Sequence, residues 1–335
     1  MARRGPITAL IAHGGAGARC PAAERGERRD GLVDAVRRGA AMLRDGASAL
    51  DAVVATVAAL EDYPLFNAGR GSLLTNAGTV EMDASVMIAS PSGAPMIPAW
   101  QLRRDGIRPP AREVLLSAGG VAGVSRVRNP VVLARAVMEK TPHVLMAGAG
   151  AERFAKRAGI ELCRPAELIT SRARERWLAR QRGADSAQPD AAAEHGTVGA
   201  VAIDSRGALA AATSTGGVPG KIAGRVGDSA IIGAGTFASA PGAASATGHG
   251  ETIIMAALCR EAVMALENGS PQAVARRAIA ELVAPAGSQA GIIIVDRRGR
   301  FGFAHNAPSM EVAAFDRTSG IRHMWLAPIA SAKSR

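Results

Sequence analysis

Threonines flanked by glycine are the residues of this sequence best suited to covalent chemistry. They occur with isolated charged residues in four short segments: 196–199 (GTVG), 214–217 (STGG), 224–229 (GRVGDS) and 247–251 (TGHGE).

Thr197 joins a segment without hydrophobic periodicity to an apolar, strand-like run. A chain cut before Thr197 would carry nucleophile and base on one residue. Its hydroxyl would attack, and its free α-amine, with a pKa of roughly 7.7–8.0, would take the proton. Gly196 lacks a Cβ, so the backbone there tolerates strain towards attack. The alternative interpretation is that these segments are ordinary turns at strand ends.

The other glycine-rich segments fit known ligand-binding motifs poorly. The run 216–221 resembles a phosphate-binding P-loop, but Thr215 stands where the first glycine belongs, and Ile222 where the magnesium-binding Ser or Thr belongs. The segment 148–150 lacks the third glycine of a dinucleotide-binding fingerprint. The segment 13–15 (HGG) resembles a hydrolase oxyanion loop, yet the sequence has no GxSxG nucleophile motif. Nucleotide binding and serine-hydrolase chemistry are therefore disfavoured.

The composition predicts a folded, basic chain. Of its 335 residues 48% are hydrophobic and 21% charged, which supplies a core and argues against disorder. The formal net charge is +11, and the dense basic run 172–182, which contains Trp177, keeps a nucleic-acid-binding protein open as an alternative. Only four of the 40 basic residues are lysines, and aromatic residues make up 3%, so a composition bias explains the arginines more simply. We interpret the run as a solvated helix and expect no nucleic-acid partner.

Cysteine usage and the apolar runs predict a cytoplasmic protein. Cys20, Cys163 and Cys259 are scattered without CxxC spacing, which fits a reducing compartment and no zinc site. The first apolar run, 7–12, is too short for a signal peptide, and no stretch reaches about 18 apolar residues. We therefore expect neither secretion nor a membrane partner.

Hydrophobic periodicity predicts the elements that position these residues. A buried strand at 7–12 should end in a glycine loop at 13–17, and apolar residues at helical spacing predict helices at 30–45 and 48–61, the second capped by Ser48. The remaining expected elements are a loop at 63–71, strands at 80–89 and 143–147, helices at 130–140 and 151–158, an irregular linker at 183–196, hairpins turning at 204–207 and 296–299, and helices at 250–267 and 271–283. Strand clusters with helices outside them indicate sheets stacked between helical layers.

Seven segments in one order resemble the plant-type asparaginase/isoaspartyl peptidase family of N-terminal-nucleophile hydrolases, over residues 7 to about 329. They are the four segments above together with 13–17 (HGGAG), 67–72 (NAGRGS) and 81–85 (EMDAS). The resemblance implies an α+β fold, an αββα sandwich, in a precursor that cuts itself between Gly196 and Thr197. Residues 1–196, with a mobile linker at about 172–196, would form the α chain, and residues 197–335 the β chain. Together they would make one structural domain, and two αβ pairs would assemble as (αβ)2.

The resemblance also implies the catalytic roles. Thr197 matches the nucleophile, and Thr215 matches the threonine that hydrogen-bonds it and tunes its protonation. Thr247 and the backbone N–H of Gly248 match the oxyanion hole. Asn67 matches a residue next to the nucleophile. No single segment is specific enough to support these assignments. They depend on the occurrence of all seven segments in this order.

The implied substrate is an aspartyl group with both of its α-charges free. Arg225 matches the residue that holds the substrate α-carboxylate, for which a planar guanidinium is well suited. Asp228, helped by the Gly248 carbonyl and beside Gly250, matches the site for the α-ammonium. The resemblance implies hydrolysis of β-aspartyl dipeptides and L-asparagine to release L-aspartate, with no catalytic cofactor. Glycosylasparaginases, which the lack of a secretion signal disfavours, and a threonine endopeptidase share the same core and are the alternatives within the family.

A structural sodium ion is implied by the match of 60–70 to a loop that wraps the ion with backbone carbonyls. Its ligands would be the backbone oxygens of Leu60, Glu61, Tyr63, Phe66, Ala68 and Arg70. Main-chain ligands leave no side-chain signature, so this expectation rests on the resemblance alone. The ion would hold Asn67 in place.

Overall fold

Two stacked β-sheets form the centre of the protein. The computed structural model describes residues 7–91, 115–183 and 196–329. The larger sheet contains, in spatial order, β12 (Gly320–Met324), β11 (Ser309–Asp316), β1 (Ala9–Gly17), β5 (Val198–Ile203), β6 (Leu209–Thr215), β2 (Met82–Ser90), β3 (Leu115–Val124) and β4 (Leu145–Ala147). The smaller sheet contains β10 (Phe301–His305), β9 (Ala290–Asp296), β8 (Gly242–Gly248) and β7 (Thr236–Ser239). Neighbouring strands are antiparallel except β3 and β4.

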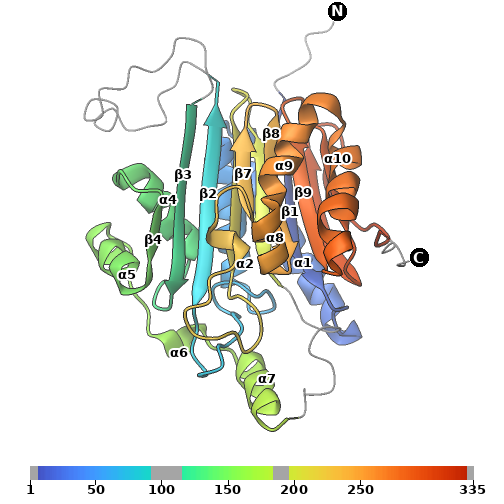
Figure 1. Cartoon of the computed structure of the whole chain (residues 1–335). Coiled ribbons are helices and arrows are strands. Elements are labelled where there is room, and N and C mark those ends of the chain that lie inside the picture. Colours follow the sequence, from blue (N-terminus) through green and yellow to red (C-terminus); the bar gives the residue numbers. More distant parts are fainter. Residues whose placement is uncertain (1–6, 92–114, 184–195, 330–335) are drawn as a thin grey trace, which may run out of the picture.

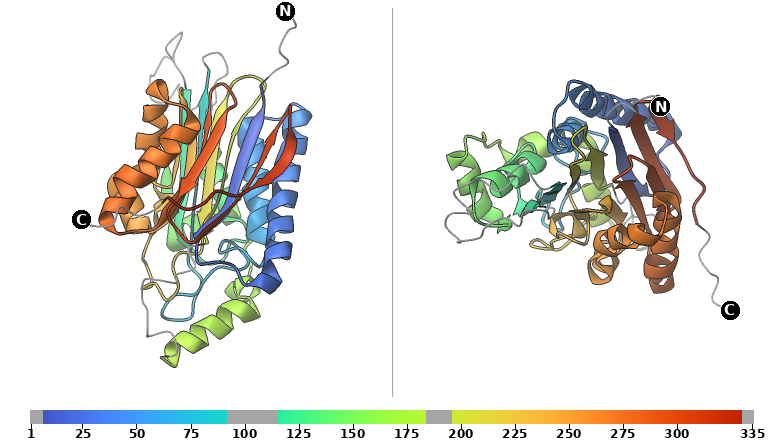
Figure 2. Two further views of the ribbon diagram at one scale, coloured as in Figure 1. Left: turned by 90° about the vertical axis from the view of Figure 1, so that its right-hand side faces the viewer. Right: turned by 90° about the horizontal axis from the view of Figure 1, so that it is seen from above.

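Helices cover the outer faces of both sheets, which gives the expected αββα layers (Figures 1 and 2). The larger sheet is covered by α1 (Arg25–Arg44), α2 (Ala49–Asp62) and α4 (Pro130–Lys140), and the smaller one by α8 (Gly250–Ala256), α9 (Leu258–Met264) and α10 (Pro271–Ala278). Three further helices lie at the side and lower end of Figure 1: α5 (Gly148–Arg157), α6 (Pro165–Leu168) and α7 (Ser171–Gln181). Among the described helices none is long and apolar enough to cross a membrane.

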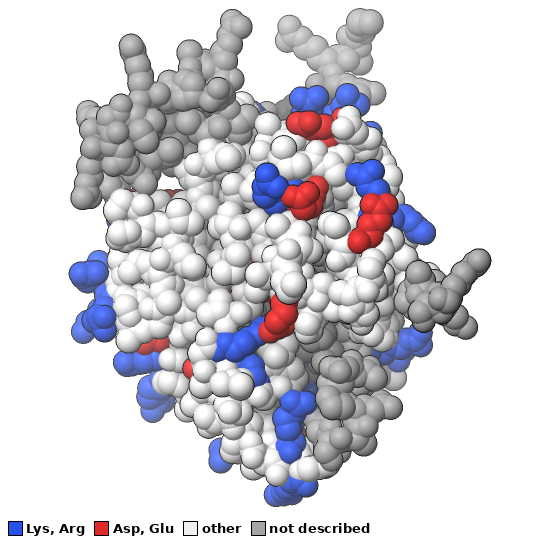
Figure 3. Space-filling model, viewed as in Figure 1, with Lys and Arg blue, Asp and Glu red and all other residues white. Residues whose placement is uncertain are grey.

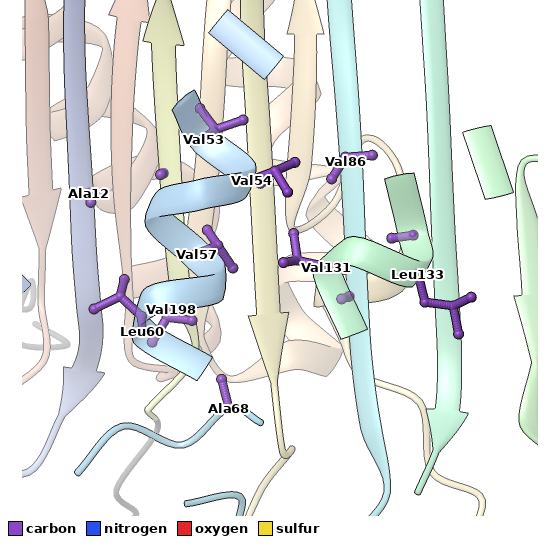
Figure 4. Close-up of a cluster of buried hydrophobic side chains, with 14 of the residues drawn as sticks. Ala12, Val53, Val54, Val57, Leu60, Ala68, Val86, Val131, Leu133 and Val198 are labelled. Carbon is purple, nitrogen blue, oxygen red and sulfur yellow. The ribbon is translucent and has the colours of Figure 1, made fainter. Parts of the chain in front are cut away.

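The central strands of the larger sheet, β1, β5, β6 and β2, are buried on both faces, because each packs on helices on one side and on the second sheet on the other. In β2, Val86 and Ile88 join the cluster under α2 and α4, whereas Met87 and Ala89 join the cluster between the sheets. Figure 4 shows the helix-side cluster, in which Val53, Val54, Val57 and Leu60 of α2 contact the sheet. In β5, Val201 faces the second sheet. The two-residue period of a strand therefore places positions 197 and 199 on that same inner face.

Most of the predicted elements are confirmed with shifted ends. Ser48 caps α2 through a capping box: its hydroxyl accepts from the Asp51 N–H at 3.1 Å, and the Asp51 carboxylate accepts from the Ser48 N–H at 3.2 Å. The hairpin β5–β6 forms around 204–207, and β9–β10 forms around 296–299. In the mobile linker predicted at about 172–196, residues 172–181 belong to helix α7. Residues 184–195, most of the irregular segment predicted at 183–196, lie outside the described residues.

The prediction of a glycine loop at 13–17 is wrong. Residues 13–17 continue strand β1 instead of leaving it, with a shift in register between His13 and Ala16. Gly15 has φ +108°, a conformation open to glycine, so the bulge lets a glycine-rich run stay in the sheet.

The prediction of one continuous helix at 250–267 is also wrong. It breaks at Ala257, whose φ of +45° separates α8 from α9. Periodicity missed β3, β7, β8, β11 and β12. β3 and β8 are rich in glycine and alanine, which carry little intrinsic strand preference, so only their place in a sheet makes them strands.

Candidate active site

Three threonines from both sheets lie at one end of the sandwich. Thr197 precedes β5 and Thr215 ends β6, and the pairing of Val198 with Ser214 sets them side by side. The Thr197 hydroxyl donates to the Thr215 hydroxyl at 3.2 Å. Both side chains are buried. The structure thus brings the predicted nucleophile and its predicted partner into contact.

Thr247 reaches this end from the second sheet. Its Oγ1 accepts a hydrogen bond from the Ala16 N–H at 3.1 Å, so its own hydroxyl proton is available to a further acceptor. Gly248 follows with φ +139°, and a methyl group there would lie 2.4 Å from the Gln289 carbonyl oxygen. Only glycine fits this position. Thr247 and Gly248 can therefore present an O–H and an N–H as a pair of donors.

The Asn67 side chain packs against Gly196, the residue before Thr197, and two hydrogen bonds hold it there. Its side-chain amide donates to the Gly217 carbonyl at 2.6 Å and accepts from the Leu73 N–H at 2.9 Å. A methyl group on Gly196 would lie 2.6 Å from the Asn67 Cβ. The side chain is thus fixed against the residue that precedes the predicted cut.

Arg225 and Asp228 converge on Gly250. A methyl group on Gly250 would lie 2.6 Å from Arg225 Nη2 and 2.9 Å from Asp228 Oδ1. Asp228 is buried, its Oδ2 has no hydrogen-bond partner among the described residues, and burial raises its pKa to about 7 although Arg225 opposes the shift. A buried carboxylate beside a guanidinium suits a ligand that carries both an ammonium and a carboxylate.

Glu251 is a residue of this site whose role the sequence did not reveal. The Arg225 guanidinium donates to both Glu251 carboxylate oxygens at 2.9 Å, in a bidentate pair. Glu251 follows Gly250 at the start of α8, and its segment was recognised without a role for it. The pair fixes the orientation of the Arg225 guanidinium.

Asp83 and Glu81 anchor the loop that carries Arg225 and Asp228, a further role missed from the sequence. The Asp83 carboxylate accepts from the Gly227 N–H and the Gly123 N–H, each at 2.9 Å. The Glu81 carboxylate accepts from the Gly224 N–H at 2.7 Å. This loop is therefore tied to β2, to the residue before it and to β3.

His13 links the two sheets under the nucleophile. Its Nε2 lies 3.0 Å from the Ser245 hydroxyl, and Ser245 in turn lies 2.7 Å from the Thr213 hydroxyl. Burial lowers the pKa of His13 to about 3, so the ring is neutral at physiological pH. Ser245 and Thr213 thus connect His13 Nε2 to the second sheet, whereas His13 Nδ1 is buried without a hydrogen-bond partner among the described residues.

The predicted sodium loop folds tightly enough to gather carbonyl oxygens. A methyl group on Gly71 would lie 2.5 Å from the Phe66 oxygen and 2.7 Å from the Pro64 oxygen, and one on Gly69 would lie 2.4 Å from the Glu61 oxygen. Oxygen donors of this kind suit a hard cation. Burial raises the pKa of the Glu61 side chain to about 8, which leaves it uncharged at neutral pH. Three of the other predicted ligand residues, Leu60, Tyr63 and Ala68, lie in or next to the same turn.

We expect Gly250→Ala to raise KM at least about 10-fold while self-cleavage and folding persist, because the added methyl group occupies the space between Arg225 and Asp228. Steady-state kinetics with L-asparagine measures the effect. Gly26→Ala is the matched control, since nothing lies within 4 Å of its added methyl group. An unchanged KM in Gly250→Ala would place the substrate elsewhere.

The pKa of Asp228 predicts a loss of activity in acid. Its pKa is raised to about 7, so the carboxylate that would bind an ammonium is present above this pH and protonated below it. A free Thr197 α-amine, with a pKa of roughly 7.7–8.0, is lost as a base in the same direction. We expect kcat/KM to fall steeply between pH 8 and about 6. A pH profile that is flat or rises over that range contradicts the assignment.

Comparison with known proteins gives one consistent result. A family model described as asparaginase matches residues 6–94 and 114–325. The isoaspartyl peptidase/L-asparaginase of Bos taurus is 40% identical over 308 residues, which cover 91% of this chain and 92% of that protein. The isoaspartyl peptidase of Escherichia coli (strain K12) is 42% identical over 316 residues, which cover 90% and 91%. The isoaspartyl peptidase/L-asparaginase of Danio rerio is 38% identical over 316 residues, which cover 92% of each chain.

Proposed function

The chain belongs to the asparaginase family, and on that premise we propose that it is a hydrolase that cleaves β-aspartyl dipeptides and L-asparagine to release L-aspartate. The observation that carries the proposal is the convergence of Arg225 and Asp228 on Gly250, at the same end of the sandwich as Thr197. The relatives named isoaspartyl peptidase/L-asparaginase support the same substrates.

The proposal includes self-cleavage before Thr197. In the precursor the Thr197 hydroxyl attacks the Gly196 carbonyl carbon, and the peptide bond is replaced by an ester to Thr197 Oγ. Water then hydrolyses the ester, which leaves a carboxylate on Gly196 and a free α-amine on Thr197. The burial of Thr197 and its contact with Thr215 support this role, as does the close packing of Gly196 on Asn67.

The cut would leave one structural domain. The α chain, 1–196, contributes β1 to β4, and the β chain, 197–335, contributes β5 to β12. Strand β1 lies between β11 and β5, so the two chains interleave within one sheet. This arrangement supports one domain made of two chains. We include in the proposal an (αβ)2 assembly, a cytoplasmic location and a structural sodium ion held by the loop 60–70.

Catalysis follows from the placement of the same groups. Thr197 Oγ attacks the side-chain carbonyl carbon of the substrate, and its proton passes to the Thr197 α-amine. The Thr247 hydroxyl and the Gly248 N–H stabilise the oxyanion, each donor contributing about 2.7–4 kcal/mol in the transition state. The α-amine returns the proton to the leaving amine, and a β-aspartyl ester forms on Thr197. Water, activated by the α-amine, then releases L-aspartate.

The substrates themselves test the function. We expect processed protein to release L-aspartate from β-Asp-Leu and from L-asparagine, measured by chromatography of the products. Release from neither substrate, in protein that has been cut before Thr197, would refute the substrate class.

A further inference from the structure

The bulge in strand β1 lies beside the predicted nucleophile. The ladder between β1 and β5 ends at the pair His13–Gly199, and Gly199 follows Thr197 by two positions. On the other side of β1, residues 14–15 lie opposite a single residue of β11, Glu311. Two residues against one make a β-bulge, which bends the strand and interrupts the ladder. The bulge therefore begins where β1 leaves the strand that follows Thr197.

The residue after the bulge, Ala16, is bonded to the second sheet. In a regular strand the ladder hydrogen bonds run to neighbouring strands of the same sheet. The Ala16 N–H instead donates to Thr247 Oγ1 of β8, in the other sheet, at 3.1 Å. This bond uses a lone pair of the Thr247 hydroxyl, so the hydroxyl proton remains for another acceptor. The direction of that proton therefore depends on the backbone geometry that the bulge gives Ala16.

The Arg28 side chain, which extends from helix α1, holds both sides of the bulge. Its Nη2 donates to the carbonyl of Gly14, the first of the two bulged residues. Its Nε donates to the carboxylate of Glu311, the residue opposite them, at 3.0 Å. Helix α1 packs on β1 and on β11, which fixes the base of the side chain. Arg28 thus ties the two strands together at the point where their ladder is interrupted.

A third hydrogen bond from Arg28 reaches the turn that leads into Asn67. Its Nη1 donates to the Leu65 carbonyl at 2.8 Å, and the guanidinium carbon lies 4.8 Å from the centre of the Phe66 ring. The same ring packs on the bulge, because a methyl group on Gly14 would lie 2.6 Å from it. Asn67 follows Phe66 and contacts the residue before the predicted cut. Arg28 therefore joins the bulge to the turn that positions Asn67.

Arg28 differs from the arginines that lie at the surface. On the face shown in Figure 3 the basic side chains stand at the surface in separate groups. Helix α7 carries the dense run 172–182, whose interpretation as a wholly solvated helix is wrong for the half-buried Arg172 and Arg176 but agrees with the exposed Arg174. The Arg28 side chain is 15% exposed, and all three of its guanidinium nitrogens donate hydrogen bonds. A planar guanidinium holds several acceptors in a fixed relation, which a lysine ammonium does not.

We propose that Arg28 is a positioning residue for the hydrolysis. By fixing the bulge it aims the Ala16 N–H at Thr247, and so it orients the hydroxyl donor that stabilises the oxyanion. The proposal rests on the proposed function, because it requires an oxyanion to form when Thr197 attacks. Arg28 acts through the backbone between Gly14 and Ala16 and is not itself a catalytic residue.

The test measures kcat and KM of the cut protein with β-Asp-Leu and L-asparagine. Arg28→Met keeps an unbranched apolar side chain against Phe66 and removes all three hydrogen bonds. Loss of a whole oxyanion donor costs about 100-fold to 1000-fold in kcat, so a misdirected donor should cost about 10-fold to 100-fold. KM should change less than about 3-fold, because Arg225 and Asp228 still hold the substrate. Arg29→Met is the matched control and keeps the wild-type kcat, since Arg29 is the next residue of α1 and its side chain is 55% exposed.

The cut fraction of each variant, measured on a denaturing gel, gives the concentration of active sites. Arg28→Lys is the second variant and should lose less kcat than Arg28→Met, because its single nitrogen keeps the charge beside Glu311 but cannot reach all three acceptors.

A kcat within about 3-fold of wild type in cut Arg28→Met overturns the proposal, and so does a loss that falls on KM as much as on kcat. Loss of the melting transition in both variants would give Arg28 a purely structural role and overturn it too. Folded chains that stay uncut in both variants would place Arg28 in self-cleavage instead of turnover, with the same consequence. Cut wild-type protein that hydrolyses neither substrate refutes the proposed function, and this proposal with it, before any variant is compared.

Discussion

Thr197→Ala should remain a single chain and hydrolyse neither β-Asp-Leu nor L-asparagine. The substitution removes the one oxygen that attacks Gly196 in the precursor and the substrate in the processed protein. The Thr215 hydroxyl lies 3.2 Å from that oxygen, but Thr215 would gain no free α-amine from the cut and so would lack the base. Because the same oxygen is the nucleophile in both steps, both steps fail together. A denaturing gel measures the first loss and aspartate release measures the second.

Thr197→Ser is the control for this result. It keeps the attacking hydroxyl and loses a methyl group, so it should still cut itself, more slowly than the wild type. Thr197→Ala that is cut at the same bond would show that another group performs the cleavage. Activity in an uncut Thr197→Ala chain would remove Thr197 from the mechanism altogether.

Processed protein should prefer β-aspartyl to α-aspartyl dipeptides by at least about 100-fold in kcat/KM. Thr197, with the Thr247 and Gly248 donors, sets the position of the scissile carbonyl. Arg225 and Asp228 set the position of a carboxylate and an ammonium on one carbon, beside Gly250. A β-aspartyl peptide satisfies both, because one methylene separates that carbon from the attacked carbonyl. In an α-aspartyl peptide the α-carboxyl group forms the amide bond, so no carboxylate is left for Arg225 to bind.

The comparison uses β-Asp-Leu and α-Asp-Leu at equal concentrations, followed by release of leucine. Arg225→Ala should fold and cut itself, yet lose turnover of β-Asp-Leu by an amount equivalent to about 2–5 kcal/mol. Arg225→Lys should be nearly as poor, since an ammonium does not reproduce the bidentate fork. Comparable rates with the two dipeptides in the wild type would contradict the assignment of Arg225 and Asp228.

Local signals predicted the hairpin that carries part of the site and singled out Thr197, whereas its contact with Thr215 was implied only by the resemblance. The turn at 204–207 fixes the register of β5 and β6, and that register sets Thr197 beside Thr215. The N-cap at Ser48 and the loop at 63–71 were equally local and were predicted. In each case the residues that determine the contact lie close together in the sequence.

Contacts between the two sheets could not be predicted in this way. Thr247 lies in β8, a strand of small residues without alternation, and it reaches Ala16 across 231 positions. The Arg225–Glu251 pair joins a loop to a helix start, and no spacing rule links them. Which side of α7 faces the protein depends on where Trp177 docks, and Trp177 contacts Asn76, which is 101 positions away in the sequence. The resemblance to known hydrolases supplied the roles of Thr247, Arg225 and Asp228 for which the local pattern gave no signal.

The measurement that tests the central claim most directly is the intact mass of the freshly purified protein, combined with N-terminal sequencing. The account predicts two chains, one ending at Gly196 and one that begins Thr-Val-Gly-Ala-Val and runs to Arg335. They should form without any added protease. A single mass for residues 1–335 in protein that hydrolyses β-Asp-Leu, or a second chain that begins at any residue other than Thr197, would contradict the claim that a freed threonine is the nucleophile.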